Sequence, residues 1–251
     1  LIKVDKPNMA QKGTISVEKT GEVFFGVNVS GEEDEDVIYQ PVYKVKGLAG
    51  AVYEITADED IITPDGTLRY HKGDVVDTVT TDEDGTAKSK ELYLGKYTVV
   101  ETKAPTGMVI NKEKHSVELT YAGQDVAVTE TATSFVNERQ KVKISLEKIL
   151  EQDEIFGIGK NNEIKNISFG LYAKEDVVSS SGTVIPADGL IEIITLDENG
   201  TATANTDLPQ PPIPHCTHRK SGARRGQYLI HHHRVGHVNA GAQSARLGTG
   251  V

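Results

Sequence analysis

The sequence predicts an all-β protein made of two β-sandwich domains in tandem, the second incomplete, followed by a disordered C-terminal tail. Helical periodicity is almost absent from the chain. Short runs rich in Val, Ile, Thr and Tyr alternate with clusters of Gly, Asp, Asn and Pro, the pattern typical of a sandwich or barrel. A diverged internal repeat then relates the two halves of the chain and indicates two similar domains.

The strand candidates of the first domain follow one another between residues that favour turns. Val, Ile, Thr and Tyr favour strands because branched and aromatic side chains pack well on a pleated surface. The turns contain Pro, which fixes φ, Gly, which takes positive φ, and Asp, which bonds to its own backbone. The predicted strands are 14–19, 23–29, 37–46, 51–56, 67–71, 75–81, 97–102, 115–121, 126–129 and 134–137.

The internal repeat keeps its order along the chain. The segment Ile-Ser-Val-Glu-Lys at 15–19 returns as Ile-Ser-Leu-Glu-Lys at 144–148, and Asp-Glu-Asp-Gly-Thr-Ala at 82–87 returns as Asp-Glu-Asn-Gly-Thr-Ala at 197–202. This order predicts that similar domains occupy both halves. The expected division is a linker from a preceding domain over 1–12, a sandwich over 13–140 and a partial second sandwich over 141–208.

The repeat ends abruptly after Leu208. Residues 209–251 contain no Asp or Glu, most of the histidines and the only cysteine, Cys216. A change of composition in the middle of a repeat predicts a tail unrelated to the domains, and we interpret it as the product of a reading-frame shift. Because the tail lacks strand patterning, we expect it to be disordered.

Composition and charge exclude several classes of function. The chain has 27 Lys and Arg against 37 Asp and Glu, a net charge of −10, which argues against nucleic acid as a partner. No stretch approaches the ~20 apolar residues of a membrane span, so we expect no membrane contact by this segment. The single Cys216 excludes an internal disulfide. Since the chain starts at Leu1 and shows no signal peptide, we expect a fragment of a longer protein.

Weaker signals have simpler explanations. The histidines at 231–233 and 237 have spacings that could bind a transition metal, but out-of-frame coding explains them better. The acidic run at 31–36 lacks the spacing of a calcium loop and is typical of a solvated surface. No P-loop, nucleophile elbow or dinucleotide fingerprint is present. We therefore expect neither a metal nor a cofactor.

The clearest motif is Leu-Gly-Lys-Tyr-Thr-Val-Val-Glu-Thr-Lys-Ala-Pro-Thr-Gly at 94–107. It resembles the closing half of the Cna B-type (SpaA-like, prealbumin-like) domains of Gram-positive surface proteins and pilins. Residues 47–54, 80–85 and 134–137 resemble further motifs of the same domains. The resemblance covers 13–140 well and 143–208 partially, and it departs at Met108, where the family usually has Tyr. It implies a prealbumin-like, immunoglobulin-like sandwich.

The resemblance also implies an intramolecular isopeptide bond between the first and last strands. By position, Lys19 is the nucleophile, Asn137 the acceptor and Glu101 the catalyst that moves the proton. Lys44 is the runner-up for the lysine. The alternative is that all of these are ordinary surface residues. The second copy offers Lys148 without a partner, because a threonine, Thr217, stands where the glutamate should be, so we predict no bond there.

The chemistry requires burial. A lysine at its ordinary pKa of ~10.4 is protonated and cannot attack. Burial disfavours the charged forms of both an amine and an acid. We expect the neutral acid to hydrogen-bond to the amide carbonyl, polarise it and later pass a proton to the departing ammonia. Neighbouring first and last strands would hold the amine against the amide.

These features predict a stalk or spacer segment of an adhesin or pilin-like protein that is extracellular and anchored to the cell wall. Each molecule forms the bond only once and is its own substrate, so we do not expect an enzyme that turns over. A ligand-binding sandwich module is the alternative. A third possibility, a hydrolase that carries these domains as decoration, would need a catalytic part outside this chain. Host or extracellular-matrix ligands would be bound through other domains of the full-length protein.

Overall fold

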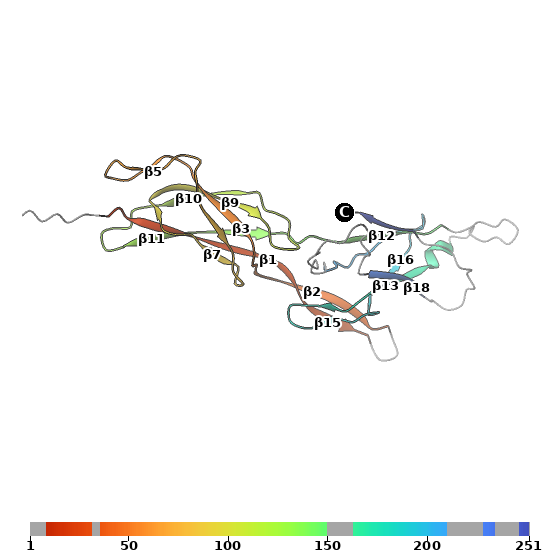
Figure 1. Ribbon diagram of the computed structural model, residues 1–251. Helices are drawn as coiled ribbons and strands as arrows, with labels where there is room; N and C mark the ends of the chain where they lie inside the picture. Colours follow the sequence, from red (N-terminus) through yellow and green to blue (C-terminus); the bar gives the residue numbers. More distant parts are fainter. Residues whose placement is uncertain (1–8, 32–35, 150–162, 210–227, 234–245, 251) are drawn as a thin grey trace, which may run out of the picture. The chain divides into compact units, whose positions relative to one another are not determined.

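The computed structural model describes residues 9–31, 36–149, 163–209, 228–233 and 246–250. Within these residues all named elements are strands except one 3-10 turn (Figure 1). The chain divides into two compact units, Leu1–Glu22 with Val45–Gln140, and Val23–Lys44 with Lys141–Val251. We call them the first and second units.

The first unit is a sandwich of two sheets (Figure 1). In one sheet β1 pairs in parallel with β11, and β7 and β8 pair with β1 on its other side. The other sheet has the order β10-β9-β3-β6 and is antiparallel. A two-stranded hairpin of β4 and β5 completes the unit. The bounds are β1 Lys12–Ser30, β2 Ile38–Gly47, β3 Val52–Ala57, β4 Ile61–Ile62, β5 Leu68–Tyr70, β6 Val75–Thr80, β7 Thr86–Lys88, β8 Leu92–Tyr93, β9 Gly95–Lys103, β10 Lys114–Leu119 and β11 Val128–Asn137. The part of β1 from Val23 and the part of β2 up to Lys44 belong to the second unit.

The core of the first unit lies between the two sheets and follows the alternation of each strand. Successive side chains of a strand point to opposite faces, so every second residue enters the core. In β3 these inward residues are Tyr53, Ile55 and Ala57, and in β9 they begin with Tyr97 and Val99. The apolar core ends in both sheets at polar inward residues, which form the site described below.

The second unit has a separate core. Its strands are β12 Lys143–Glu147, β13 Ser168–Ala173, β14 Val177–Val178, β15 Val184–Ile185, β16 Leu190–Thr195, β17 Thr201–Thr203, β18 Tyr228–His233 and β19 Arg246–Gly250, with the 3-10 turn Glu163–Asn166. Leu146, Phe169 and Leu171 are among its buried residues. Phe24 and Tyr39, from the N-terminal segment of this unit, pack against the same core.

The internal repeat is visible in the backbone of both units. The Lys19 amide donates to the carbonyl of Gly85 at 2.7 Å, and the Lys148 amide donates to the carbonyl of Gly200 at 2.8 Å. Each glycine closes the turn that carries the repeated Asp-x-x-Gly-Thr motif, and each has a positive φ, 80° and 76°. Positive φ is the conformation that glycine adopts without a steric penalty.

Three differences from the prediction concern the continuity of two strands, one domain boundary and the tail. β1 runs without a break through the gap predicted at 20–22, and β11 joins the predicted strands 126–129 and 134–137. The predicted first domain, 13–140, included Val23–Lys44, which the structure assigns to the second unit.

The third difference concerns the tail, in which the sequence predicted no strand. The structure has β18 and β19 there, and they pair with β13 and β12. Any backbone with free N–H and C=O groups can pair with an open sheet edge, whatever its side chains. Between 210 and 251 the remaining residues lie outside the described ones, and disorder stays a prediction for them.

Candidate isopeptide site

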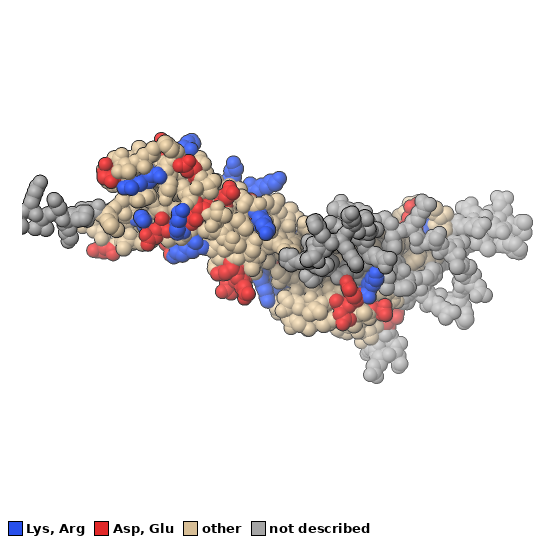
Figure 2. Space-filling view, in the orientation of Figure 1, with Lys and Arg blue, Asp and Glu red and all other residues tan. Residues whose placement is uncertain are grey.

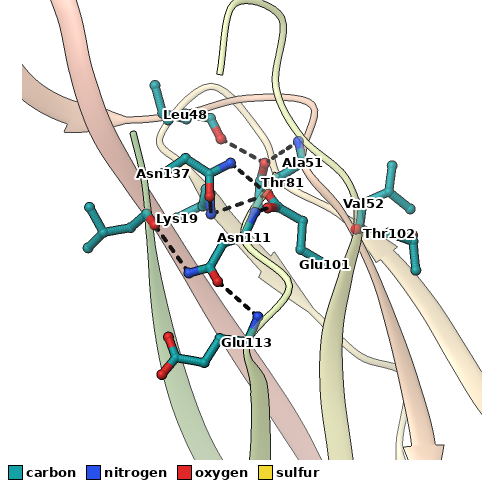
Figure 3. Close-up of polar contacts among 11 residues, drawn as sticks. Lys19, Leu48, Ala51, Val52, Thr81, Glu101, Thr102, Asn111, Glu113 and Asn137 are labelled. Carbon is teal, nitrogen blue, oxygen red and sulfur yellow. Dashed lines mark hydrogen bonds and ion pairs between the residues drawn. The ribbon is translucent and has the colours of Figure 1, made fainter. Parts of the chain in front are cut away.

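Lys19, Glu101 and Asn137 meet at one end of the first unit's core (Figure 3). Each of them continues the inward-facing row of its own strand: Lys19 in β1, Glu101 in β9 and Asn137 at the end of β11. In the parallel β1–β11 pair, Lys19 stands opposite Phe135, so Asn137 is its diagonal neighbour on the same face. The three residues are 0%, 2% and 2% exposed.

The three side chains are joined by polar contacts. The Lys19 amine donates to Oδ1 of Asn137 and lies 3.2 Å from Oε1 of Glu101. The Asn137 amide nitrogen donates to the same Oε1 at 2.9 Å. A single carboxylate oxygen therefore touches both the amine and the amide, the arrangement needed to move a proton between them.

The surroundings of the amine are apolar and aromatic. The Lys19 nitrogen lies 5.9 Å from the centre of the Tyr53 ring and 5.7 Å from that of Phe135. These two rings pack on each other with centroids 4.8 Å apart. Burial lowers the pKa of Lys19 from its ordinary value of 10.5, and the neighbouring Glu101 opposes the shift through its charge and its hydrogen bond. Burial thus shifts Lys19 in the direction of the neutral, nucleophilic amine.

One detail differs from the expected chemistry. We expected the acid to hydrogen-bond to the amide carbonyl, but the amide nitrogen faces Glu101 and the carbonyl oxygen faces Lys19. The reason is that the ammonium group of a lysine can only donate, so it takes the carbonyl oxygen and leaves the N–H groups to the carboxylate.

Two residues of this site were not among those predicted for it, although Tyr53 lies in the family motif at 47–54. Tyr53 contributes a ring to the lining, and its hydroxyl is buried with no hydrogen-bond partner among the described residues. Burial and the nearby Glu101 both raise the pKa of this phenol. Asn111 donates its backbone N–H to Oε2 of Glu101 at 2.6 Å. A backbone donor leaves no side-chain pattern, which is why sequence reasoning missed it.

The runner-up lysine, Lys44, has a different environment. It belongs to the second unit, is exposed, and its nitrogen lies 3.8 Å above the ring of Phe25. An exposed amine lacks the burial that the reaction requires, and the Asn137 amide contacts Lys19 instead. The geometry therefore selects Lys19 as the candidate nucleophile.

Lys148 of the second unit is 9% exposed and occupies the same place in the repeat as Lys19. Strand β18 pairs with β13 as β9 pairs with β3: His232 stands opposite Phe169, just as Glu101 stands opposite Tyr53. The sequence placed Thr217 at this position, and Thr217 lies outside the described residues. By strand register the position belongs to a histidine, so this unit lacks the carboxyl group there.

The described residues contain no cluster of His, Cys, Asp or Glu that could hold a metal ion, and His237 lies outside them. No helix among the same residues is long and apolar enough to cross a membrane. On the face drawn in Figure 2, acidic and basic side chains of the first unit are both widely spread.

A surface hollow of about 580 Å³ lies over β1, β7 and β11 and is lined by Ser16, Glu18 and Lys88 among others. Most of its lining residues are polar, and none is aromatic. It also shares no residue with the site of Lys19, Glu101 and Asn137.

Comparisons with known proteins agree with this architecture. Residues 42–133 match the family model of the SpaA prealbumin-like fold domain, a range that includes Glu101. The trypsin-resistant surface T6 protein of Streptococcus pyogenes serotype M6 is 28% identical over 143 residues, which cover 55% of this chain and 25% of that protein. The chain therefore spans about a quarter of the length of this curated relative.

Solved structures with a similar fold include the TIE protein of Bacillus anthracis, at 19% identity and a TM-score of 0.38, covering 79% of this chain and 44% of that one. The major pilin SpaD of Corynebacterium diphtheriae has 16% identity and a TM-score of 0.36, covering 79% and 54%. The sequence resemblance is confirmed by the family model over residues 42–133, which match the SpaA prealbumin-like fold domain.

Proposed function

We propose that this chain is a structural spacer segment of a pilin-like or adhesin-like surface protein, and that its first unit closes an isopeptide bond between Lys19 and Asn137. The observation that carries the bond is the burial of an amine, an acid and an amide in mutual contact. Buried ionisable side chains without a role are uncommon, because desolvation makes them costly.

The reaction begins with the pair formed by Lys19 and Glu101, which shares one proton. Transfer of this proton across the 3.2 Å contact converts ammonium and carboxylate into a neutral amine and a neutral acid. An apolar surrounding favours the neutral pair relative to water, because neither product carries a charge. The transfer stays inside the site and needs no outside base.

The amine of Lys19 then attacks the side-chain carbonyl carbon of Asn137. A bond forms between the lysine nitrogen and that carbon, and the negative charge develops on Oδ1. Collapse of the tetrahedral intermediate breaks the bond between the carbon and Nδ2. Glu101 accepts a proton from the attacking nitrogen and delivers one to Nδ2, which its Oε1 already contacts at 2.9 Å. Ammonia leaves, and Glu101 keeps the second of the two protons that the lysine nitrogen gives up, so it ends as the neutral acid formed in the first step.

Strand geometry supplies the proximity. The parallel pairing of β1 with β11 fixes amine and amide as diagonal neighbours, so the two groups react as parts of one molecule. Effective concentrations of well-oriented intramolecular groups reach about 10⁵–10⁸ M. The protein is its own substrate and turns over once.

The intact mass of the full chain tests this proposal. We expect the parent to be lighter than its sequence mass by one ammonia, and not by two, because Lys148 has no acid at the matching register position. Glu101→Gln keeps the shape of the side chain but removes the acid, and it should have the full mass. Lys19→Arg should also have the full mass, whereas Lys44→Arg should behave as the parent.

Peptide mapping of the parent should identify a branched peptide that joins Lys19 to Asn137. A folded parent with the full sequence mass would refute the bond and leave a sandwich spacer held by non-covalent contacts alone. A branched peptide at Lys44 would instead refute the assignment of the nucleophile.

The role of the whole protein follows from its relative. The curated relative is a surface protein by name, and on this basis we place this chain outside the cell. Anchoring to the cell wall rests on the resemblance of the sequence motifs. A covalent clamp between terminal strands suits a spacer, because tension along the chain then passes through one covalent bond instead of a ladder of hydrogen bonds. Ligands of the host would be bound elsewhere in the full-length protein.

A further inference from the structure

The Glu101 carboxylate has two differently used oxygens. Oε1 faces the reacting groups, at 3.2 Å from the Lys19 nitrogen and 2.9 Å from that of Asn137. Oε2 faces away from them and accepts the backbone N–H of Asn111 at 2.6 Å (Figure 3). The carboxylate is therefore held by contacts at both oxygens, one of which comes from a loop outside the strands that carry the reacting groups.

Asn111 lies in the segment between β9 and β10 and is itself held by its side chain. Its amide nitrogen donates to the carbonyl of Val136 at 3.3 Å, next to the acceptor Asn137. Its amide oxygen accepts the backbone N–H of Glu113 at 2.9 Å. Losing the side chain would remove both contacts but leave the Asn111 backbone N–H in place.

The surrounding loop is also tied to the end of β11. The Val109 amide donates to the carbonyl of Glu138 at 2.8 Å, and Gln140 donates to that of Gly107 at 2.9 Å. The Asn111 side chain is thus the last of a series of links between this loop and the strand that carries Asn137. Of these three links, the one made by the Asn111 side chain comes from the same residue whose backbone N–H contacts Glu101.

The contact with Asn111 decides where the acid carries its proton. The Asn111 N–H at 2.6 Å occupies a lone pair of Oε2 and favours the carbonyl form of that oxygen, so the proton that Lys19 releases is favoured on the other oxygen. That other oxygen is Oε1, which touches the nucleophile and the leaving nitrogen. A carboxyl group rotated by half a turn would hold its proton away from both.

We propose that Asn111 is a positioning residue, whose side chain sets the loop so that its backbone N–H occupies Oε2 and directs the proton of Glu101 toward Lys19 and Asn137. This role rests on the proposed isopeptide reaction. Asn111 does not touch the reacting atoms, and it acts only through the orientation of Glu101.

The test follows bond formation in the full chain after dilution from denaturant, with unreacted chain as starting material and intact mass as the readout. Asn111→Ala should slow bond formation by about tenfold to a hundredfold, the usual effect of a small misplacement in a reacting site. Asn111→Asp keeps the oxygen that accepts the Glu113 N–H and loses the donor to Val136. Its rate should fall between those of the parent and the alanine variant.

Asp65→Ala is the matched control. Asp65 accepts the backbone N–H of Thr67, two residues further on, at 3.1 Å, as Asn111 accepts that of Glu113. Its turn lies in the β4–β5 hairpin, which contributes no residue to the site. Circular dichroism at each time point should show that all variants are folded, so that only the chemical step differs.

Equal rates for the parent and both Asn111 variants would overturn the role of Asn111. So would an equal slowing of Asn111→Ala and Asp65→Ala, since this would reflect a general loosening of the fold. A parent that never loses ammonia would refute the isopeptide bond itself, which is a different failure from equal rates among chains that all react.

Discussion

Oε1 of Glu101 lies 3.2 Å from the Lys19 nitrogen, and neither side chain reaches solvent. A buried ion pair of this kind is weak evidence for a stabilising role, because desolvation can exceed the Coulombic gain. Contact with a third group, the Asn137 amide, makes a chemical role the better explanation. The predictions below separate the chemistry from the packing around it.

The cross-link should add measurable stability. By the chain-entropy model, joining two residues 118 positions apart is worth roughly 4–5 kcal/mol, since the unfolded chain loses freedom. Urea unfolding of the full chain should therefore give a lower midpoint for Glu101→Gln than for the parent. Lys44→Arg, a change at an exposed site, should leave the midpoint in place. Equal midpoints for Glu101→Gln and the parent would mean that the bond, if formed, adds no stability.

The rate of bond formation should depend on pH as a bell-shaped curve. The reactive state holds one proton between Lys19 and Glu101, so a second proton or the loss of the last one stops the reaction. Burial lowers the pKa of Lys19 from 10.5. The alkaline limb should therefore begin below pH 10.5, and mass spectrometry of quenched refolding samples would locate it.

A rate that kept rising up to pH 10.5 would contradict this shape. It would show that Lys19 loses its proton to solvent and that Glu101 does not share it. Unfolding curves at the same pH values are needed as a control, because a chain that unfolds in alkali would imitate the falling limb.

Gly21 should be required for the position of Asn137. The two residues are paired in β1 and β11, and a Cβ at Gly21 would lie 2.8 Å from the Asn137 carbonyl oxygen. Gly21→Ala must displace the end of β11, at a cost of about 1–3 kcal/mol for overpacking. We expect lower stability and slower bond formation, measured by urea unfolding and intact mass.

Gly26→Ala is the control in the same strand. A Cβ there would lie 3.6 Å from its nearest neighbour, the Thr183 hydroxyl, which is an ordinary contact. Bond formation at the parent rate in Gly21→Ala would show that the end of β11 adapts without disturbing Asn137.

The Tyr53 hydroxyl should be dispensable. It is buried with no hydrogen-bond partner among the described residues, and an unsatisfied polar group of this kind costs about 1–3 kcal/mol. Tyr53→Phe keeps the ring against Phe135 and should leave stability equal or higher, with the bond intact. Tyr97→Phe is the control, because the Tyr97 hydroxyl donates to the Tyr93 carbonyl, and its loss should destabilise the fold. Loss of the cross-link in Tyr53→Phe would instead show that the hydroxyl takes part in the reaction.

The sequence predicted the class of fold well because alternation and turn chemistry are local. It predicted a break in β1 near Gly21, since glycine usually interrupts a strand. The structure continues the strand there because a residue without a side chain allows β11 to approach. The short strands β7 and β8 were missed because two or three residues carry no measurable periodicity.

The three residues of the candidate site were found through family motifs, and strand alternation then explains their burial. Asn111 could not be predicted because it contributes a backbone N–H, which every residue except proline has. The grouping of Val23–Lys44 with the second unit was equally hidden. The alternation of apolar and polar residues around Phe24 and Tyr39 is compatible with a strand in either domain. Only the tertiary structure shows which core these two side chains enter.

That grouping has a topological consequence. Val23–Lys44 lies between Lys19 and Asn137 in the sequence but packs in the second unit. Once the bond closes, this hairpin is part of a covalent ring that no unfolding event can open. If the core of the second unit melted, the hairpin would remain part of this ring, and the contour length of the ring would stay fixed. The second unit could then refold around a segment that had never been pulled away.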